Sequence, residues 1–487
     1  MRLGTLVKVL DEKLDMSNAQ NTVISGIHFH SQKVEPGFVF VAIRGFSEDG
    51  NQYVQEAIAS GAVAIIGEDK LEHINGIPYI SVPDSRLALS RLSAAFYQFP
   101  ARKHKVIGIT GTNGKTTTAF MLHHLLTYAK KTVTLVSSVY HIINGEQRQS
   151  TATTPDARTI QKILAESQDE FVIIEVSSHG LDQKRVEDVV FDLAIFTNLS
   201  HDHLNYHQNM EEYFLSKRHL FQLLKENGQA IIATYSQNFG ERMANEVRKQ
   251  GVMVTTIGAN SSNDVYSTYS TEFSTLFELN KKENPNDSLM LKLPIKGVYQ
   301  SRNALIAYIT AEKCGLEAPI IQAAFSSFQG VPGRFQMTHL KNGAHVVIDY
   351  AHSPDAIQAC LQTVASYQPH SIYHIFGFRG DSDASKRKVM VDNSITYSDY
   401  TILTLDDLNG VSMTEMESVL RYYQKVANVQ VRIILDRTMA IETVFNQLQK
   451  DDWLVITGKG HETYKQKFER PVTDDQGMIN HLIDYSK

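Results

Sequence analysis

The sequence predicts an α/β protein of three domains, with a central P-loop-type parallel sheet and a C-terminal doubly wound α/β domain. At 487 residues the chain is too long for one hydrophobic core. Apolar strand-like segments alternate with helix-like segments, which is typical of mostly parallel sheets covered by helices. A glycine-rich loop also stands between a strand-like and a helix-like segment, as in nucleotide-binding α/β domains.

Two short segments mark the expected domain boundaries. Helix-like residues 87–99 end at Pro100 and are followed by the basic residues 102–105, and a segment rich in glycine and proline spans residues 330–333. We therefore expect an N-terminal domain over residues 1–103, a central domain over 104–332 and a C-terminal domain over 333–487.

Hydrophobic patterning predicts the elements in order. The N-terminal segment has strands over 37–43 and 62–66 and a helix over 87–99. The central segment has strands over 106–110, 171–176 and 193–196 and helices over 119–126 and 211–224. The stretch 259–287 is rich in Ser, Thr and Asn, which predicts a polar excursion or hairpins. The C-terminal segment alternates helices with strands over 344–350, 371–377, 400–405 and 453–457.

Composition excludes several classes of protein. A net charge of −6, from 47 Lys+Arg and 53 Asp+Glu, gives no reason to expect nucleic-acid binding. The two cysteines, Cys314 and Cys360, do not make a disulfide framework, which fits a reducing compartment. Residues 1–14 lack the apolar run of a signal peptide, and no stretch approaches the roughly 20 apolar residues of a membrane span. We expect a cytoplasmic protein without membrane insertion.

The loop from Gly111 to Thr117 predicts a nucleotide phosphate site. Its glycines let backbone N–H groups turn toward a phosphate, and the dipole of the following helix adds to the attraction. Lys115 supplies a positive charge for the β- and γ-phosphates, and a following Thr hydroxyl can hold Mg²⁺. Ile109 stands where the strict spacing has glycine. The pattern indicates nucleotide binding but does not distinguish a kinase, an ATPase and a ligase.

Carboxylate and imidazole groups follow two other predicted strands. Glu175 ends one strand, and His201, His203 and His207 follow another. Beside a phosphate loop, these groups suggest a metal–phosphate site. Taken alone, the three histidines also fit a zinc hydrolase site or purely structural roles. A bound nucleotide with Glu175 explains the cluster without a second metal chemistry.

Several motifs, in order along nearly the whole chain, resemble those of the Mur ligases. They are Gly-Thr-Asn-Gly-Lys-Thr-Thr from residue 111, Glu-Val-Ser-Ser-His from 175, Asn-Leu-Ser-His-Asp-His from 198, Tyr-Phe-Leu-Ser-Lys-Arg from 213, Asp-Tyr-Ala-His-Ser-Pro-Asp from 349 and Gly-Lys-Gly-His-Glu from 458. They are most similar to the MurE type, which adds the third amino acid to UDP-N-acetylmuramoyl-L-alanyl-D-glutamate. The resemblance implies an N-terminal UDP-sugar-binding, a central ATP-binding and a C-terminal amino-acid-binding domain.

The resemblance also implies roles for individual residues. The implied ATP contacts are Gly111, Thr112, Asn113, Gly114, Lys115, Thr116, Thr117, Asn303, Arg334, Asp349 and His352. Two Mg²⁺ ions are implied, with ligands from Thr116, Glu175, His203 and a carbamylated Lys217. The implied catalytic residues are Lys115, Lys217, His203 and Glu175. The UDP-muramoyl-dipeptide is expected at Ser31, Thr153, Thr154, Ser177, Gln183 and Arg185. The acceptor amino acid is expected at Arg387, Asp406, Asp407, Asn409, Gly458 and Glu462.

The reaction implied by the resemblance has two steps. A dipeptide carboxylate takes the γ-phosphoryl group of ATP, which gives an acyl phosphate and ADP, and the amine of an amino acid then displaces phosphate. Both steps build negative charge on oxygen atoms, so two Mg²⁺ ions and Lys115 suit the chemistry. We expect small-molecule partners only, and a monomer.

Residues 406–409 depart from the family pattern. Members that use meso-diaminopimelate show Asp-Asn-Pro-Arg here, whereas this chain has Asp406, Asp407, Leu408 and Asn409. The arginine that would pair with the acceptor's second carboxylate is absent, and two carboxylates favour a cationic side chain. We therefore expect lysine or a similar diamine rather than diaminopimelate, with Arg379 as a nearby cation that opposes this inference.

Further departures lie at the uridine and acceptor ends. His30 and Gln32 flank Ser31 in place of Asp and Arg, Gln300 replaces an Asn, Ser382 an Arg, and Asn205 an Asp. They leave open a divergent Mur-type ligase that acts on another carboxylate outside the main peptidoglycan pathway, for example one similar to folylpolyglutamate synthetase. A nucleotide-binding regulator would need a broken catalytic set, and Lys115, Glu175, His203 and Lys217 are all present.

Overall fold

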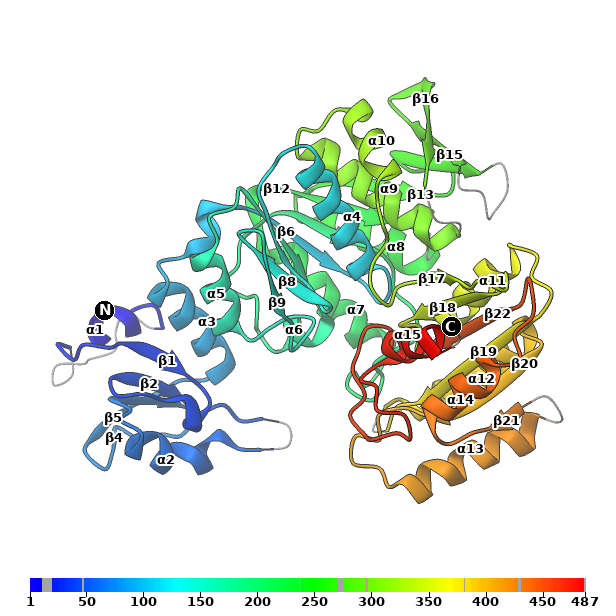
Figure 1. Ribbon diagram of the computed structural model, residues 1–487. Helices are drawn as coiled ribbons and strands as arrows, with labels where there is room; N and C mark the ends of the chain where they lie inside the picture. The colour runs from blue at the N-terminus through cyan, green and yellow to red at the C-terminus, as the bar shows by residue number, and fades with distance from the viewer. Residues whose placement is uncertain are drawn as a thin grey trace.

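Three mostly parallel sheets follow one another along the chain in the computed structural model, each with its own helices (Figure 1). The structure describes residues 1–10, 20–45, 48–235, 237–269, 276–293, 297–380, 382–427 and 431–485. The predicted α/β class with three units is confirmed. Within the described ranges, no helix is both long and apolar enough to cross a bilayer.

The first sheet has the order β1-β2-β3-β5-β4, and only β4 runs antiparallel to its neighbour. Its strands are β1 (Gly26–His28), β2 (Phe38–Val41), β3 (Ala64–Gly67), β4 (His73–Ile74) and β5 (Ile77–Ser81). Its helices are α1 (Leu3–Val7), α2 (Val54–Ala59) and α3 (Ser85–Phe96). The Asp84 side chain accepts from the N–H groups of Arg86 and Leu87, so the predicted helix begins two residues earlier than the apolar pattern indicates.

The central sheet has eleven strands, in the order β16-β15-β14-β13-β12-β11-β6-β10-β7-β8-β9. They are β6 (Lys105–Thr110), β7 (Val133–Val136), β8 (Tyr140–Ile143), β9 (Glu146–Gln149), β10 (Phe171–Glu175), β11 (Phe191–Phe196), β12 (Leu224–Ala233), β13 (Met253–Gly258), β14 (Val265–Tyr269), β15 (Leu276–Lys281) and β16 (Asn284–Lys292). The last three form antiparallel pairs, so the predicted hairpins are confirmed where the structure describes them.

Successive residues of the central strands enter two different cores. Ile107 and Ile173 pack on one face of the sheet, and their neighbours Val106 and Val172 pack on the other. Apolar residues on both faces require helices on both faces. One face carries α4 (Lys115–Tyr128), α9 (Val298–Lys313) and α10 (Ala318–Ser326). The other carries α5 (Ala157–Glu166), α6 (Ser178–Asp182), α7 (Met210–Arg218) and α8 (Gln237–Arg248).

The helix expected over 211–224 is shorter in the structure. α7 ends at Arg218, a 3₁₀ turn covers His219–Leu223, and β12 begins at Leu224. The apolar residues Leu220 and Phe221 are fully buried in the turn. The hydrophobic pattern therefore predicted the burial of these residues correctly, but it could not distinguish a last α-helical turn from a 3₁₀ turn.

The third sheet has the order β17-β18-β22-β19-β20-β21, with β17 antiparallel and the rest parallel. Its strands are β17 (Gln336–His339), β18 (His345–Asp349), β19 (Ile372–Phe378), β20 (Tyr400–Leu405), β21 (Val431–Ile433) and β22 (Trp453–Thr457). Its helices are α11 (Pro354–Ala365), α12 (Arg387–Tyr397), α13 (Met413–Ala427), α14 (Arg437–Phe445) and α15 (Asp475–Tyr485). The loops after β18, β19, β20 and β22 lie at the same edge of this sheet, where ligands bind in open α/β sheets.

That edge contacts the phosphate loop of the central sheet. Arg334 Nη2 donates to Thr116 Oγ1 at 3.2 Å, and His461 Nε2 lies 3.2 Å from the Ser138 carbonyl oxygen. Lys386 Nζ forms an ion pair of 2.8 Å with Asp202 Oδ1. The two sheet edges therefore enclose one region, and the predicted site residues come from both sides of it.

Candidate active site

The phosphate loop has the backbone shape that its glycines predict. Gly111 and Gly114 have φ values of 148° and 87°, and a Cβ at position 111 would lie 1.9 Å from Thr197 Oγ1. Lys115 Nζ donates to the carbonyl oxygens of Gly111 at 2.7 Å and Thr112 at 2.9 Å, so its side chain lies across the loop. Burial lowers the pKa of Lys115 to about 8, although Glu175 acts in the opposite direction.

Glu175 is the buried carboxylate of this site. It has no exposed surface, and it accepts from Thr116 Oγ1 at 2.8 Å and from the Ser138 N–H at 3.2 Å. None of the described residues forms an ion pair with it. A buried carboxylate without a cation is costly, and hard oxygen donors such as Glu175 and Thr116 suit Mg²⁺. The residues present therefore fit a magnesium ion.

His203 lines the same cavity as Glu175, in a loop where its φ is 57°. Burial lowers the pKa of His203 to about 3, despite the Asp202 carboxylate, which raises it. A neutral imidazole has a lone pair for a metal or a hydrogen-bond donor. His201 instead lies 3.0 Å from Asp383 Oδ2, across the boundary between the central and C-terminal sheets. Among described residues, no group of three His, Cys, Asp or Glu forms a metal site, so the zinc hydrolase alternative has no support.

Lys217 lies behind the phosphate loop and does not line the cavity. Its side chain is 1% exposed, its Nζ donates to the Gly111 carbonyl at 2.9 Å, and it stands 4.4 Å from the centre of the Tyr213 ring. Burial, together with the nearby Lys115, holds the pKa of Lys217 well below its usual range. A neutral, buried amine is the reactive form of lysine.

The phosphate cavity has a volume of about 330 Å³ and also contains most residues expected to bind the dipeptide. These are Thr153, Thr154, Ser177 and Arg185. Arg185 donates through Nη1 to the Thr154 carbonyl at 2.7 Å and through Nη2 to Gln183 Oε1 at 2.7 Å. Gln183 therefore orients Arg185 and does not line the cavity itself. Arg185 thus supplies an anion-binding guanidinium to the cavity that Glu175 and Lys115 also line.

Ser31 stands apart from this cavity, in the first sheet's domain. It is 4% exposed, and its hydroxyl donates to Glu56 Oε2 at 2.7 Å. The structure thus brings the phosphate and dipeptide residues together but leaves the expected uridine contact at a different place. A long UDP-sugar substrate is compatible with such a separation.

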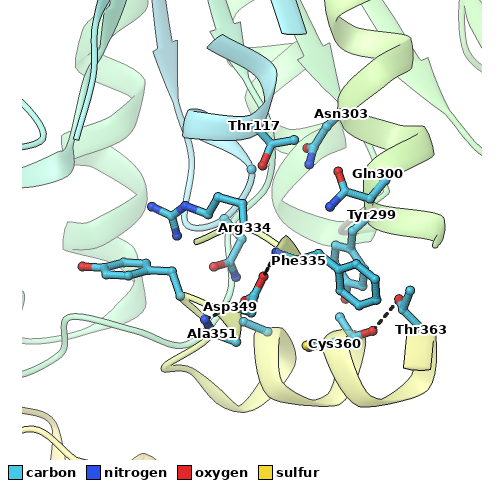
Figure 2. A pocket seen from close by; sticks show the side chains of 15 residues that line it. Thr117, Tyr299, Gln300, Asn303, Arg334, Phe335, Asp349, Ala351, Cys360 and Thr363 are labelled. Atoms are coloured by element: carbon cyan, nitrogen blue, oxygen red, sulfur yellow. Dashed lines mark hydrogen bonds between the residues drawn. The ribbon is translucent and has the colours of Figure 1, made fainter. Parts of the chain in front are cut away.

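A second cavity, of about 110 Å³, lies on the other side of Arg334 and is shown in Figure 2. Of the expected ATP contacts, it is lined by Asn113, Gly114, Thr117, Asn303, Arg334 and Asp349. Asp349 accepts from the N–H groups of Phe335 at 2.6 Å and Ala351 at 2.7 Å, which fixes the segment that carries Arg334 (Figure 2). His352 is not part of this wall: its Nε2 lies 3.5 Å from Asp202 Oδ2.

A third cavity, of about 210 Å³, adjoins the phosphate cavity on the C-terminal side. Arg379, Lys386 and Arg387 line it with the acids Asp202 and Asp383. The Nε atoms of Arg379 and Arg387 are buried without a hydrogen-bond partner among the described residues. Two half-buried guanidinium groups whose Nε atoms are enclosed in this way are suited to the carboxylate of an amino acid.

The segment 406–409 lies beside this cavity but does not line it. Asp407 pairs with Lys459 Nζ at 2.7 Å and stands 3.7 Å from Lys465 Nζ. Asn409 donates to the Gly380 carbonyl at 3.1 Å and accepts from Lys465 Nζ at 3.0 Å. One of the two aspartates on which the lysine expectation rested is therefore neutralised within the chain.

Asp406 retains a free acceptor. Its Oδ1 lies 4.0 Å from Arg379 Nε, whereas its buried Oδ2 has no hydrogen-bond partner among the described residues. A Cβ at Gly458, where φ is 108°, would lie 2.7 Å from that oxygen, so Gly458 keeps the space beside it open. Glu462 accepts from Arg379 Nη2 at 2.5 Å. Burial alone would raise the pKa of Glu462, but Arg379 and Lys459 outweigh it and lower the pKa.

Sequence reasoning missed several residues that the structure places in these walls. They are Ser138, Asp202, Tyr350 and Lys386. Ser138 follows the buried strand β7, which pairs with β10, so its position at a strand end was a usable signal. Lys386 and Asp202 are far apart in the sequence, and no local pattern predicts that they meet.

Comparisons with known proteins agree with this geometry. Three family descriptions match consecutive parts of the chain: "Mur ligase family, catalytic domain" over residues 23–97, "Mur ligase middle domain" over 109–311 and "Mur ligase, glutamate ligase domain" over 333–460. A UDP-N-acetylmuramoyl-L-alanyl-D-glutamate--2,6-diaminopimelate ligase of Syntrophomonas wolfei is 34% identical over 475 residues, which cover 96% of this chain and 95% of that protein. The ligase of the same name from Oceanobacillus iheyensis is 30% identical over 474 residues, with 96% and 95% covered.

Solved structures show the same architecture. A structure of a 2,6-diaminopimelate ligase of that name superposes with a TM-score of 0.69 at 25% identity, covering 100% of this chain and 99% of the other. MurF ligase from Thermotoga maritima, in complex with ADP, gives a TM-score of 0.65 at 21% identity, with 90% and 94% covered, and shares the fold. The chain therefore belongs to the Mur ligase family, as an ATP-dependent ligase of the MurE type.

Proposed function

We propose that this ligase adds the third amino acid to UDP-N-acetylmuramoyl-L-alanyl-D-glutamate in peptidoglycan synthesis, acting as a monomer. The observation that carries the proposal is the adjacency of the phosphate and acceptor cavities, which share Asp202, His203, Tyr350 and His352. A phosphorylated carboxylate held in the first cavity is thereby next to an amine held in the second.

In the first step, the terminal carboxylate of the dipeptide attacks the γ-phosphorus of ATP. An O–P bond forms as the bond to the β,γ-bridging oxygen breaks, which gives an acyl phosphate and ADP. Lys115 and the loop N–H groups hold the phosphates, and Arg185 orients the carboxylate. Mg²⁺, held by Thr116 and Glu175 with His203, would neutralise charge on the transferring phosphoryl group.

In the second step, the neutral amine of the acceptor attacks the acyl carbon. The tetrahedral intermediate collapses with loss of phosphate, which takes the C–O bonding electrons, and the proton lost by the nitrogen ends on the released phosphate. Arg379 and Arg387 are positioned to hold the acceptor's carboxylate, which leaves its amine directed toward the shared wall of the two cavities. Enclosure between two sheet edges limits the water that would hydrolyse the acyl phosphate.

Lys217 is proposed to carry a carbamate. In its deprotonated form the Lys217 amine would attack CO₂ to form an N–C bond, and loss of one proton from the nitrogen would turn that neutral amine into a carbamate anion. Support comes from its burial (1% exposed), from the lack of an ion pair with any described residue and from its hydrogen bond to the phosphate loop. The new anion would lie next to Gly111 and favour a second magnesium ion.

For the acceptor, we propose lysine or a similar diamine. Position 409 has no guanidinium, and the Asn409 amide is committed to Gly380 and Lys465. Asp406 Oδ2 has no hydrogen-bond partner among the described residues, so it can accept from a cation. Diaminopimelate is the second candidate, because the named relatives use it and because Lys465 supplies a cation 3.0 Å from Asn409. In that case Lys465→Met would impair the use of diaminopimelate and leave lysine unaffected.

The test is product analysis with ¹⁸O in the dipeptide carboxylate. Purified protein, ATP, Mg²⁺ and UDP-N-acetylmuramoyl-L-alanyl-D-glutamate are incubated with lysine, ornithine or diaminopimelate. The proposal expects an amide product and one ¹⁸O atom in the released phosphate, because the acyl phosphate transfers a carboxylate oxygen. Tight ATP binding with no product from any of these amino acids would refute it and favour a ligase for another carboxylate.

A further inference from the structure

Tyr350 lies where all three cavities meet. It directly follows β18, and it is the only described residue that lines the nucleotide, phosphate and acceptor cavities together. Two nearby residues of the chain already have contacts of their own: Asp349 accepts a hydrogen bond from the Ala351 N–H group, and His352 lies beside Asp202. The three cavities hold the reactants of two successive steps, so a shared side chain is placed to connect them.

The ring of Tyr350 contacts the nucleotide side. The Arg334 guanidinium carbon stands 4.0 Å from the ring centre, and Arg334 Nη2 donates to Thr116 Oγ1. Arg334 Nε is buried without a hydrogen-bond partner among the described residues. The ring is therefore the surface that holds this guanidinium over the phosphate loop.

The hydroxyl of Tyr350 contacts the acceptor side. It donates to Glu462 Oε1 at 3.0 Å and accepts from Arg379 Nη1 at 3.3 Å. Arg379 also donates to the Gly458 carbonyl at 2.8 Å. Burial raises the pKa of Tyr350, so the phenol keeps the proton that it donates. One hydroxyl thus links the carboxylate and the guanidinium beside the acceptor cavity.

We propose that Tyr350 is a positioning residue that connects the two steps: its ring fixes Arg334 for the nucleotide, and its hydroxyl fixes Glu462 and Arg379 for the amino acid. This role rests on the proposed function, because it assigns the third cavity to the acceptor. It predicts that the two halves of the side chain have separable effects on the two ligands.

The test compares Tyr350→Phe with Tyr350→Leu. Phe keeps the ring, so affinity for a non-hydrolysable ATP analogue should stay within about twofold. Loss of a hydroxyl that bonds two charged groups should weaken lysine binding to the nucleotide-loaded protein, and raise the KM for the amino acid, by about tenfold. Leu removes both contacts, so analogue affinity should also fall, by about threefold or more. Calorimetric titration measures both affinities without turnover.

A merely structural role for Tyr350 would give a different result. Both variants would then lose thermal stability, and their affinities for the two ligands would fall together. The proposed role is overturned if Tyr350→Phe changes neither the affinity for the ATP analogue nor the affinity for lysine, or if it changes both equally. It is also overturned if the nucleotide-loaded wild-type protein binds no amino acid. The proposed function is judged separately, on whether wild type forms the ¹⁸O-labelled phosphate. If Tyr350→Leu does not fold, the isosteric Phe variant still decides between the outcomes.

Discussion

The phosphate end and the acceptor end of this site differ in how they are built. At the phosphate end, residues 111–114 form the loop, residues 115–117 begin α4, and one neighbouring strand supplies Glu175. At the acceptor end, Arg379, Arg387, Asp406 and Glu462 come from four separate loops or helix ends. A local motif determines the first geometry, whereas long-range packing determines the second. Residue identities therefore predict which side chains line one cavity better at the phosphate end than at the acceptor end.

The largest effect is expected at the phosphate end. Lys115→Ala removes the cation that lies across the loop, which should lower kcat by about 10³ or more, in line with the loss of a transition-state donor. Steady-state phosphate release measures it. Lys130→Ala, an exposed lysine beyond α4, is the matched control and should behave as wild type. Equal losses in the two variants would mean that the loop is not the catalytic phosphate site.

A smaller, rescuable loss is expected from Lys217→Ala. The substitution removes the proposed carbamate, so kcat should fall by about 10², because a second metal ion would lack one anionic ligand. Added acetate or formate should restore part of the rate, since a small carboxylate fits the vacated volume beside Gly111. Loss without rescue by any short carboxylate would contradict the carbamate and leave Lys217 a structural residue.

At the acceptor end, Arg387→Ala should raise the KM for the amino acid by about tenfold or more with little effect on the KM for ATP. The reason is that its free buried donor has no other partner among the described residues. Lys388→Ala, the exposed neighbour that pairs with Asp392, serves as control. Similar changes in both KM values would show that the third cavity is not specific to the acceptor.

The smallest effect is expected at Asn409. Asn409→Ala loses hydrogen bonds to Gly380 and Lys465 and replaces Asn, which tolerates the left-handed φ of 44°, by a residue that tolerates it less well, so the free energy of unfolding should fall by about 1–2 kcal/mol. Asn409→Gly loses the same bonds but tolerates the backbone, so it should be the milder variant. Denaturant unfolding compares them, and identical losses would show that backbone strain contributes nothing.

Much of the fold was predictable, because buried parallel strands and the loop around Lys115 leave strong local patterns. The elements that sequence patterning missed are those whose shape depends on packing against residues distant in the sequence, such as the 3₁₀ turn at His219–Leu223. In the site, Glu175 and His203 were identified from strand ends beside the loop. Tyr350 and Lys386 were not, since their importance arises only when the two sheet edges meet. The internal pairing of Asp407 with Lys459 likewise depends on folding.

The central claim is that the phosphate end retains the family's chemistry while the acceptor end has changed. Competition between lysine and diaminopimelate in one reaction, with UDP-N-acetylmuramoyl-L-alanyl-D-glutamate and ATP, tests it most directly. The expected result is an excess of the lysine product by about tenfold or more, because Asn409 gives the second carboxylate no guanidinium partner. The claim would be contradicted if the diaminopimelate product predominated and if the Lys465→Met variant no longer formed that product.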